Sequence, residues 1–445
     1  GRLKDLAEEV KKEIPIKAVV GSLPRPNQAF WTLSALWAGW LWGPEAVEAY
    51  KPALRRRRYD WAWNATASNA AFTHLFGLLH LGTPFFALLS EPEPSFLTSA
   101  LTAASAAGFD LRSVAMRTEH DPIQILWTCG EHLKRLPGEA RIEDVREAIQ
   151  THIEERGEPA SYLHVHAAGL IELAKSHALK QKDQEFDEAL REVQALIERA
   201  LEEDPRFVHH SSGESVETGL WGLNTTGDVL PPKDASQNRS GESLSDRVEI
   251  AVVSFLQKHP NSIYLEIAHD VYPRFPGLLT PSHGIIYAVL SSYAGKEAGT
   301  WRLRPEDVAA TRRSELNAIS NLLEALGKRL DYSTRREGKH RFWEQDGKVK
   351  RTFTILASAL LARAIAETPN PAGQTTIVIP GGRAALAAYK IQRDPELAGR
   401  IKEIQVVKYR LLRTLIELPV LTRETFEEQI AGDPLEKSKA QMALF

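Results

Sequence analysis

Hydrophobic and polar positions in the first half of the chain follow two different periods. Apolar residues spaced three and four apart predict helices at Asn27–Trp42, Ala65–Leu79 and Ser95–Ala107. Short apolar runs predict strands at Ile16–Val20, Pro84–Leu89, Ser113–Arg117 and Pro122–Trp127. Residues 141–203 have a mostly helical pattern with many charges. Strands that alternate with helices indicate an α/β fold, with a parallel or mixed sheet that is covered by helices.

The second half begins with three predicted helices and a short strand. Their ranges are Ser245–Lys258, Ser262–Val271, Ser282–Tyr293 and Thr300–Leu303. This is the order of a winged helix. A long helix is predicted at Pro305–Leu330, ending near Gly327. Asp346-Gly347 then predicts a β-hairpin, and an α/β pattern follows, with a helix at Ser358–Glu367, a strand at Thr375–Pro380, a helix at Ala384–Arg393 and a strand at Ile404–Val407.

Residues 224–243 have no apolar periodicity and are rich in turn formers, so they are predicted to be a linker. The predicted organisation is therefore an α/β domain over 1–135, a helical extension over 136–223 and the linker over 224–243. A winged-helix-like segment over 244–305 and a small α/β domain over 306–445 follow.

Composition excludes several classes of protein. The chain has 445 residues and a formal net charge of −3. Its single cysteine, Cys129, excludes internal disulfides and multi-thiolate metal sites. No segment has the pattern of a signal peptide or a spanning helix, so we expect a cytoplasmic protein without a membrane partner. The chain has two methionines and does not begin with one, which suggests that the natural protein extends before Gly1.

Charge is distributed unevenly. Residues 1–243 hold 26 Lys and Arg against 35 Asp and Glu, a net −9, whereas residues 244–445 hold 29 against 23, a net +6. A basic second half favours an acidic partner such as nucleic acid. The basic residues around the predicted hairpin are the leading DNA-binding candidates: Arg335, Arg336, Lys339, Arg341, Lys348, Lys350 and Arg351. The run Arg55, Arg56, Arg57 and Arg58 is a second candidate, for DNA or a partner protein, with a solvated loop as the alternative.

Residues 10–130 resemble the catalytic domain of class I, adenine-specific DNA methyltransferases, from the middle of that Rossmann-like fold to its end. The resemblance is carried by an apolar strand, a Trp- and Phe-rich helix at Phe30–Trp42, a second apolar strand at Pro84–Leu89, a helix and a closing pair of strands, in the family's order. It is closest to large bacterial proteins of this kind. In that family a strand ends in Asp-Pro-Pro-Tyr or Asn-Pro-Pro-Tyr, which holds a flipped adenine at the methyl donor.

The catalytic turn departs from this pattern. Where the family has its tetrapeptide, this chain has Ser22, Leu23, Pro24 and Arg25. Leu23 and Arg25 supply neither the carbonyl that accepts from adenine nor the ring that stacks on it. No Gly-x-Gly donor loop is present, so no cofactor is expected, and S-adenosylmethionine enters only if another segment or subunit completes an active enzyme. The tail bears a weaker resemblance to restriction-endonuclease-like folds, but its second hairpin strand lacks the carboxylate and lysine of such sites.

Other candidates have plain structural explanations. The tryptophans between Trp31 and Trp63 fit a base-stacking platform or, with better support from their spacing, a buried helix. His152, His164 and His166 fit structural histidines better than metal ligands, so no metal is predicted. Glu91 and Glu93 fit either acid–base groups or a helix entry. The sequence thus predicts a DNA-binding, catalytically degenerate methyltransferase-like component of a larger bacterial restriction or anti-phage assembly. The alternatives are an active methyltransferase and a protein-binding scaffold.

Overall fold

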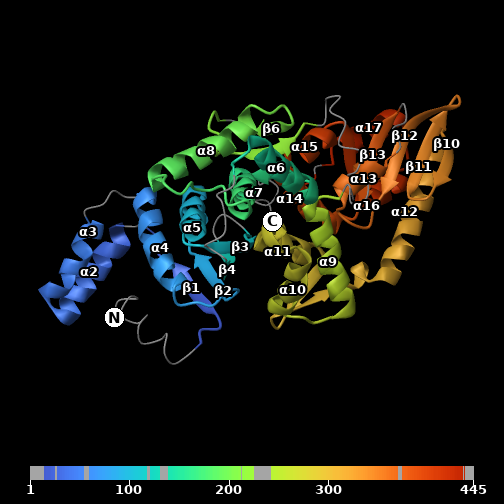
Figure 1. Cartoon of the computed structure of the whole chain (residues 1–445). Coiled ribbons are helices and arrows are strands. Elements are labelled where there is room, and N and C mark those ends of the chain that lie inside the picture. Colours follow the sequence, from blue (N-terminus) through green and yellow to red (C-terminus); the bar gives the residue numbers. More distant parts are fainter. Residues whose placement is uncertain are drawn as a thin grey trace. The chain divides into compact units, whose positions relative to one another are not determined.

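The computed structural model describes residues 15–25, 28–54, 60–117, 121–130, 139–211, 213–224, 242–368, 373–433 and 435. They form two compact units of mixed α/β structure (Figure 1). Unit 1 lies within Gly1–Ile153, Ala160–Asp228 and Gly277–Thr280, and unit 2 within Glu154–Pro159, Val229–Pro276 and Pro281–Phe445. Most of the predicted linker falls outside the described residues.

The main sheet of unit 1 has the strand order β1-β2-β4-β3. β1 (Val19–Leu23) and β2 (Pro84–Leu89) run parallel, and β4 (Ile123–Cys129) runs antiparallel between β2 and β3 (Phe109–Ala115). The predicted range Ile16–Val20 for β1 is wrong by three residues. The strand lies three residues later because it pairs with β2 in the register that sets Leu23 opposite Leu89 and buries Leu23 in the core.

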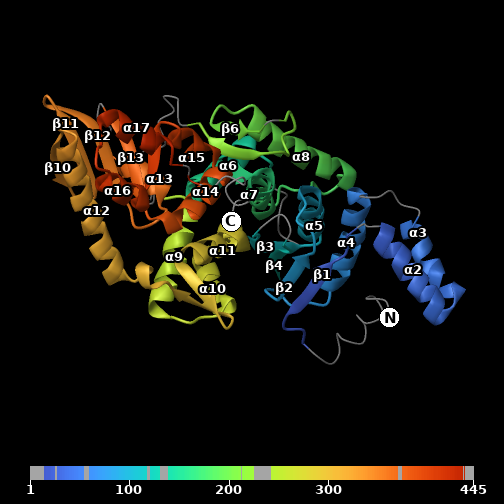
Figure 2. The same cartoon turned by 180° about the vertical axis from the view of Figure 1, so that it is seen from behind.

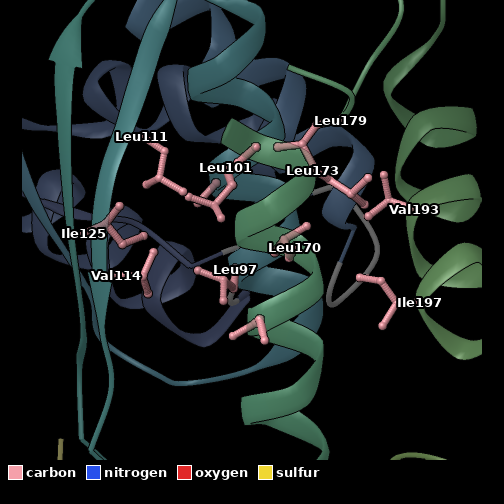
Figure 3. Close-up of a cluster of buried hydrophobic side chains, with 14 of the residues drawn as sticks. Leu97, Leu101, Leu111, Val114, Ile125, Leu170, Leu173, Leu179, Val193 and Ile197 are labelled. Carbon is pink, nitrogen blue, oxygen red and sulfur yellow. The ribbon is translucent and has the colours of Figure 1, made fainter. Parts of the chain in front are cut away.

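Helices α4 (Trp61–Phe76) and α5 (Pro94–Ala106) pack side by side against this sheet (Figure 2). The Phe72 ring of α4 lies 5.6 Å from the Phe85 ring of β2. α5 consists largely of small and apolar residues, and it is buried on nearly every side. Figure 3 shows Leu97 and Leu101 of α5 between the strand residues Leu111 and Ile125 on one side and the next helix on the other.

The predicted helical region comprises α6 (Ile142–Arg156), α7 (Tyr162–Lys175) and α8 (Phe186–Glu202), as expected for 141–203. Leu170 and Leu173 of α7 face Val193 and Ile197 of α8 in the core of unit 1 (Figure 3). A small sheet that the sequence pattern did not predict has the order β5-β7-β6. Its strands are only two to four residues long: β5 (Ala160–Ser161), β6 (Phe207–His210) and β7 (Leu220–Leu223).

The Trp-rich helix α2 (Gln28–Trp42) is followed by a 3-10 segment, η1 (Pro44–Tyr50), and by α3 (Lys51–Leu54). The expectation that its tryptophans pack on the sheet is wrong for the described side chains, because Trp40 is 75% exposed and Trp37 and Trp42 are also exposed. None of them belongs to the core of unit 1. The small residues Ala35 and Ala38 are buried instead, on the side where α2 contacts η1.

The first part of unit 2 contains the predicted three helices, α9 (Leu244–Lys258), α10 (Tyr264–Val271) and α11 (His283–Tyr293). Ser243 and Ser282 cap α9 and α11 by accepting hydrogen bonds from the amides of Asp246 and Ile285. A two-stranded antiparallel hairpin follows, made of β8 (Ala294–Glu297) and the predicted strand β9 (Thr300–Leu303).

The second part of unit 2 has a five-stranded sheet in the order β10-β11-β12-β13-β14. The predicted hairpin is confirmed: Asp346 and Gly347 have φ of 53° and 72°, as a two-residue type I′ turn requires. The first three strands are antiparallel and the last two add in parallel. The strands are β10 (Ser333–Glu337), β11 (His340–Gln345), β12 (Lys348–Ile355), β13 (Gln374–Ile379) and β14 (Ile404–Lys408).

Helix α12 (Ala309–Arg329) contacts one face of this sheet, where Trp343 donates its indole N–H to the carbonyl oxygen of Leu323 at 3.1 Å. The Phe426 ring of α17 (Arg423–Ala431) lies 5.1 Å from the Trp343 ring in the same core. The helices of this part are α12 (Ala309–Arg329), α13 (Leu361–Glu367), α14 (Ala384–Arg393), α15 (Pro395–Ile401), α16 (Tyr409–Glu417) and α17 (Arg423–Ala431).

A buried ionic cluster joins α9 to the second part of unit 2. The Lys390 ammonium of α14 donates to Asp246 at 2.6 Å and to Glu249 at 2.5 Å, and all three side chains are almost fully buried. Burial lowers the pKa of Lys390, but the two carboxylates raise it by more, so the amine stays charged. The cluster links α9 to α14 inside unit 2.

Candidate functional site

The turn that follows β1 lies at the carboxyl end of the parallel strands, where α/β sheets usually bind ligands. Arg25 pairs here with Glu91 and, at 2.5 Å, with Glu93, both from the segment after β2. The Asn64 side chain of α4 donates to the carbonyl oxygen of Pro24 at 3.2 Å. Ser99 of α5 donates in turn to the amide oxygen of Asn64 at 2.8 Å. The turn is therefore tied to three neighbouring segments.

The other two residues of the turn belong to β1. Ser22 donates to the carbonyl oxygen of Leu88 on the paired strand, with a long contact of 3.4 Å, and Leu23 is buried in the core. Leu23 offers no polar group to a ligand, and Ser22 offers only its hydroxyl. The structure thus brings Ser22, Leu23, Pro24 and Arg25 to the expected edge of the sheet, with their polar groups used in contacts inside the protein.

Glu91 and Glu93 are part of this arrangement. Glu93 is the N-cap residue of α5, which begins at Pro94, and both carboxylates face the Arg25 guanidinium. The helix-entry interpretation of this segment is favoured, and an acid–base role has no support in the geometry.

The basic candidates of unit 2 divide into two groups. Arg341 and Arg351, two of the predicted DNA-binding residues, are buried and make their contacts inside the protein. Arg341 donates to Ser320 at 2.7 Å, and Arg351 donates to Thr376 and Gln405 and pairs with Glu427. The pleat of the sheet directs both side chains inward, Arg341 toward α12 and Arg351 toward α17.

Arg335 and Lys339 are partly exposed but engaged in ion pairs. Arg335 pairs with Glu337 and with Glu344 at 2.9 Å, and Lys339 pairs with Glu367. The side chains of Arg336, Lys348 and Lys350 are exposed, and none of them makes a hydrogen bond or ion pair with another described residue. These three cations are the part of the predicted set that remains accessible to phosphate.

Two further predictions concern the arginine run and the histidines. Arg55, Arg56, Arg57 and Arg58 lie outside the described residues. The rings of His152 and His164 stack 6.2 Å apart in the interior of unit 1, and His166 is fully buried. Across the described ranges no three His, Cys, Asp or Glu side chains are grouped so that they could hold a metal ion. The geometry favours structural histidines.

The helix that a winged helix would insert into a DNA groove is α11, and one side of it is covered. The Tyr389 hydroxyl of α14 lies so close to Gly284 that a Cβ there would approach it to 2.8 Å. Ser292, at the other end of α11, donates to the carbonyl oxygen of Gly382 at 2.8 Å. Any contact of this part with DNA must use another side of the segment.

The endonuclease-like resemblance of the tail is not supported at a site. Glu344 is held by Arg335, and Asp346 forms the hairpin turn. Asn64 and Ser99 could not be identified from the sequence, because single polar residues in apolar helices carry no distinct signal before the helices are packed together.

None of the helices in the described part of the chain is long and apolar enough to cross a membrane. Comparison with known proteins gives no relatives: no family model, no curated protein and no solved structure matches the chain.

Proposed function

We propose that this chain is a DNA-binding, catalytically degenerate methyltransferase-like component of a larger bacterial restriction or anti-phage assembly. The observation that carries the proposal is the turn after β1, where Arg25 is paired with Glu91 and Glu93. These ion pairs occupy the edge of the sheet where the resemblance implies a base pocket.

The sheet of unit 1 supports the methyltransferase-like part of the proposal. Its two parallel strands are connected through helices, and the β3–β4 pair closes the sheet with β4 next to β2. A closing strand pair after the second apolar strand is what the resemblance implies. The net charge of +6 over residues 244–445 supports contact with an anionic partner.

Binding to DNA is tested by reversing the three accessible cations. We expect Arg336→Glu, Lys348→Glu and Lys350→Glu together to weaken binding of the full chain to duplex DNA at low salt. The slope of log K against log salt should fall by up to about 3, near 0.9 for each lost phosphate contact. Fluorescence anisotropy with a labelled duplex across a salt series measures both quantities.

The matched control is Lys182→Glu, a reversal at an exposed lysine of unit 1. It should leave the slope unchanged. Equal loss in the control and the triple variant would show that only net charge matters. If the wild-type chain has no affinity for DNA at low salt, the DNA-binding proposal fails and a protein-binding scaffold is favoured, with the exposed tryptophans of α2 as its contact surface.

The degenerate turn is tested by transfer of labelled methyl groups. Incubated with S-adenosylmethionine and DNA, the chain is expected to give no incorporation above background. The physical reason is that Ser22, Leu23 and Arg25 offer neither a side-chain carbonyl oxygen for the adenine amino group nor a ring to stack on the base. Robust transfer that is lost in Ser22→Ala and Pro24→Ala variants would support the alternative, an active adenine-specific enzyme completed by another segment or subunit.

A further inference from the structure

A row of aromatic side chains runs across α10, α11 and the β8–β9 hairpin of unit 2. The Tyr264 and Tyr287 rings are stacked 4.5 Å apart with an angle of 3° between their planes. His283 lies 5.6 Å beyond Tyr264, and Trp301 of β9 lies 6.4 Å beyond Tyr287. Tyr287 is 42% exposed although most of α11 is buried. We call these four residues the aromatic row.

The charges around the aromatic row favour an anion. The Lys296 ammonium lies 5.7 Å from the centre of the Trp301 ring, because the two residues are directly paired in the hairpin. Glu297 is the next residue along β8, so it points to the opposite face of the hairpin. The carboxylates of Glu266 and Asp270 line a groove on another side of α10.

Polar groups lie at the other end of the row. The hydroxyls of Tyr264 and Tyr272 are 2.5 and 3.0 Å from Nδ1 of His283. His283 is the first residue of α11, where the helix dipole favours negative charge. Tyr287 is the exposed ring of the row, while Tyr264 and His283 are half-buried and Trp301 is buried. The row therefore offers the exposed ring of Tyr287 between a lysine and a helix N-terminus.

We propose that the aromatic row binds single-stranded DNA by stacking on its bases, with Lys296 and the start of α11 beside the phosphates. Stacking on fixed aromatic rings suits unpaired bases, because bases inside a duplex already stack on one another. The other side of α11 is covered by α14, so the row is the accessible side of this helix. The inference rests on the proposed DNA binding and names the form of DNA.

The experiment compares binding of the full chain to a labelled twenty-nucleotide oligo(dT) and to a duplex of equal length. Tyr287→Ala is expected to weaken oligo(dT) binding about tenfold, because the variant loses the ring on which one base stacks. Tyr287→Phe keeps the ring and should stay within about twofold of wild type. Leu265→Ala is the matched control, because Leu265 is 72% exposed on α10 and lies outside the row.

A second measurement separates stacking from a general loss of affinity. 2-Aminopurine placed within the oligo(dT) should be quenched by the wild-type chain and by Tyr287→Phe, and much less by Tyr287→Ala at saturating protein. Unchanged oligo(dT) affinity of a folded Tyr287→Ala variant overturns the inference, while the salt-dependent duplex binding described above would still support the proposed function. Equal losses on oligo(dT) and duplex also overturn it. Absence of all DNA binding by the wild-type chain overturns both proposals.

Discussion

Replacement of Lys390 by methionine is expected to destabilise unit 2 by about 3–5 kcal/mol. The variant keeps the volume of the side chain but leaves Asp246 and Glu249 buried without their cation. Glu249 also accepts hydrogen bonds from the Tyr293 hydroxyl and, at 2.8 Å, from the amide of Ala359, so loss of the cluster affects α9, α11 and the start of α13 together. Urea unfolding, with hydrogen exchange of α9 as a local measure, gives the free energy.

The matched control is Lys258→Met, at an exposed lysine that ends the same helix α9. Its free energy of unfolding should lie within about 0.5 kcal/mol of wild type. A third variant combines Lys390→Met with Asp246→Asn and Glu249→Gln, which removes all three charges. It is expected to recover a large part of the loss, because the penalty comes from unpaired buried charge. If the triple variant is no more stable than Lys390→Met, the loss of stability comes from altered packing and not from unpaired charge.

The sequence predicted the elements of unit 2 better than it predicted this cluster. Most element ranges of unit 2 followed from periodicity: α14 and β9 have their predicted bounds, and the type I′ turn at Asp346-Gly347 is where expected. Asp246, Glu249 and Lys390, by contrast, are charged residues on helix faces that pack together only after folding. Their sequence separations of more than 140 residues leave no local signal of the contact.

Gly327 has a role that the sequence does not reveal. The long helix predicted at Pro305–Leu330, ending near Gly327, is α12, which ends at Arg329. A Cβ at Gly327 would lie 2.7 Å from the indole nitrogen of Trp343 and 2.6 Å from the Thr334 side chain. The glycine is there for the close approach of β10 and β11 to the helix, a requirement that belongs to the packed fold.

The position of the candidate site on the sheet was predicted better than the contacts of its side chains. The turn after β1 lies where the α/β pattern placed it, but the pairing of Arg25 with Glu91 and Glu93 depends on the parallel register of β1 and β2. Arg341 and Arg351 show the same limit, because in the sequence a buried arginine looks like any other residue of a basic strand. Their partners come from other strands and helices.

Acidification is expected to destabilise unit 1 through His166. Burial lowers the pKa of this imidazole to about 4, against a smaller opposing effect of its hydrogen bond with Gln194. Between pH 6.5 and 4 the imidazole of the unfolded chain takes up a proton, whereas that of the folded chain does not. The free energy of unfolding of unit 1 is therefore highest above pH 6.5 and decreases as the pH falls toward 4. The loss amounts to about 3 kcal/mol.

The variant His166→Gln tests this result, because a glutamine amide can replace Nε2, the ring nitrogen that lies 3.1 Å from the Gln194 side-chain oxygen. The difference in unfolding free energy between wild type and variant, followed by hydrogen exchange of α7 from pH 7 to 4, should change by about 3 kcal/mol. His80→Gln, at an exposed position, should give no such change. Asp394 of unit 2 acts in the opposite direction. Burial raises the pKa of its carboxyl to about 6, so the folded chain takes up a proton before the unfolded chain does and the folded state becomes more stable as the pH falls. If the difference in unfolding free energy between wild type and His166→Gln does not change between pH 6.5 and 4, His166 is not a buried neutral group. If the His80→Gln control shows the same change with pH, the effect arises in the unfolded state.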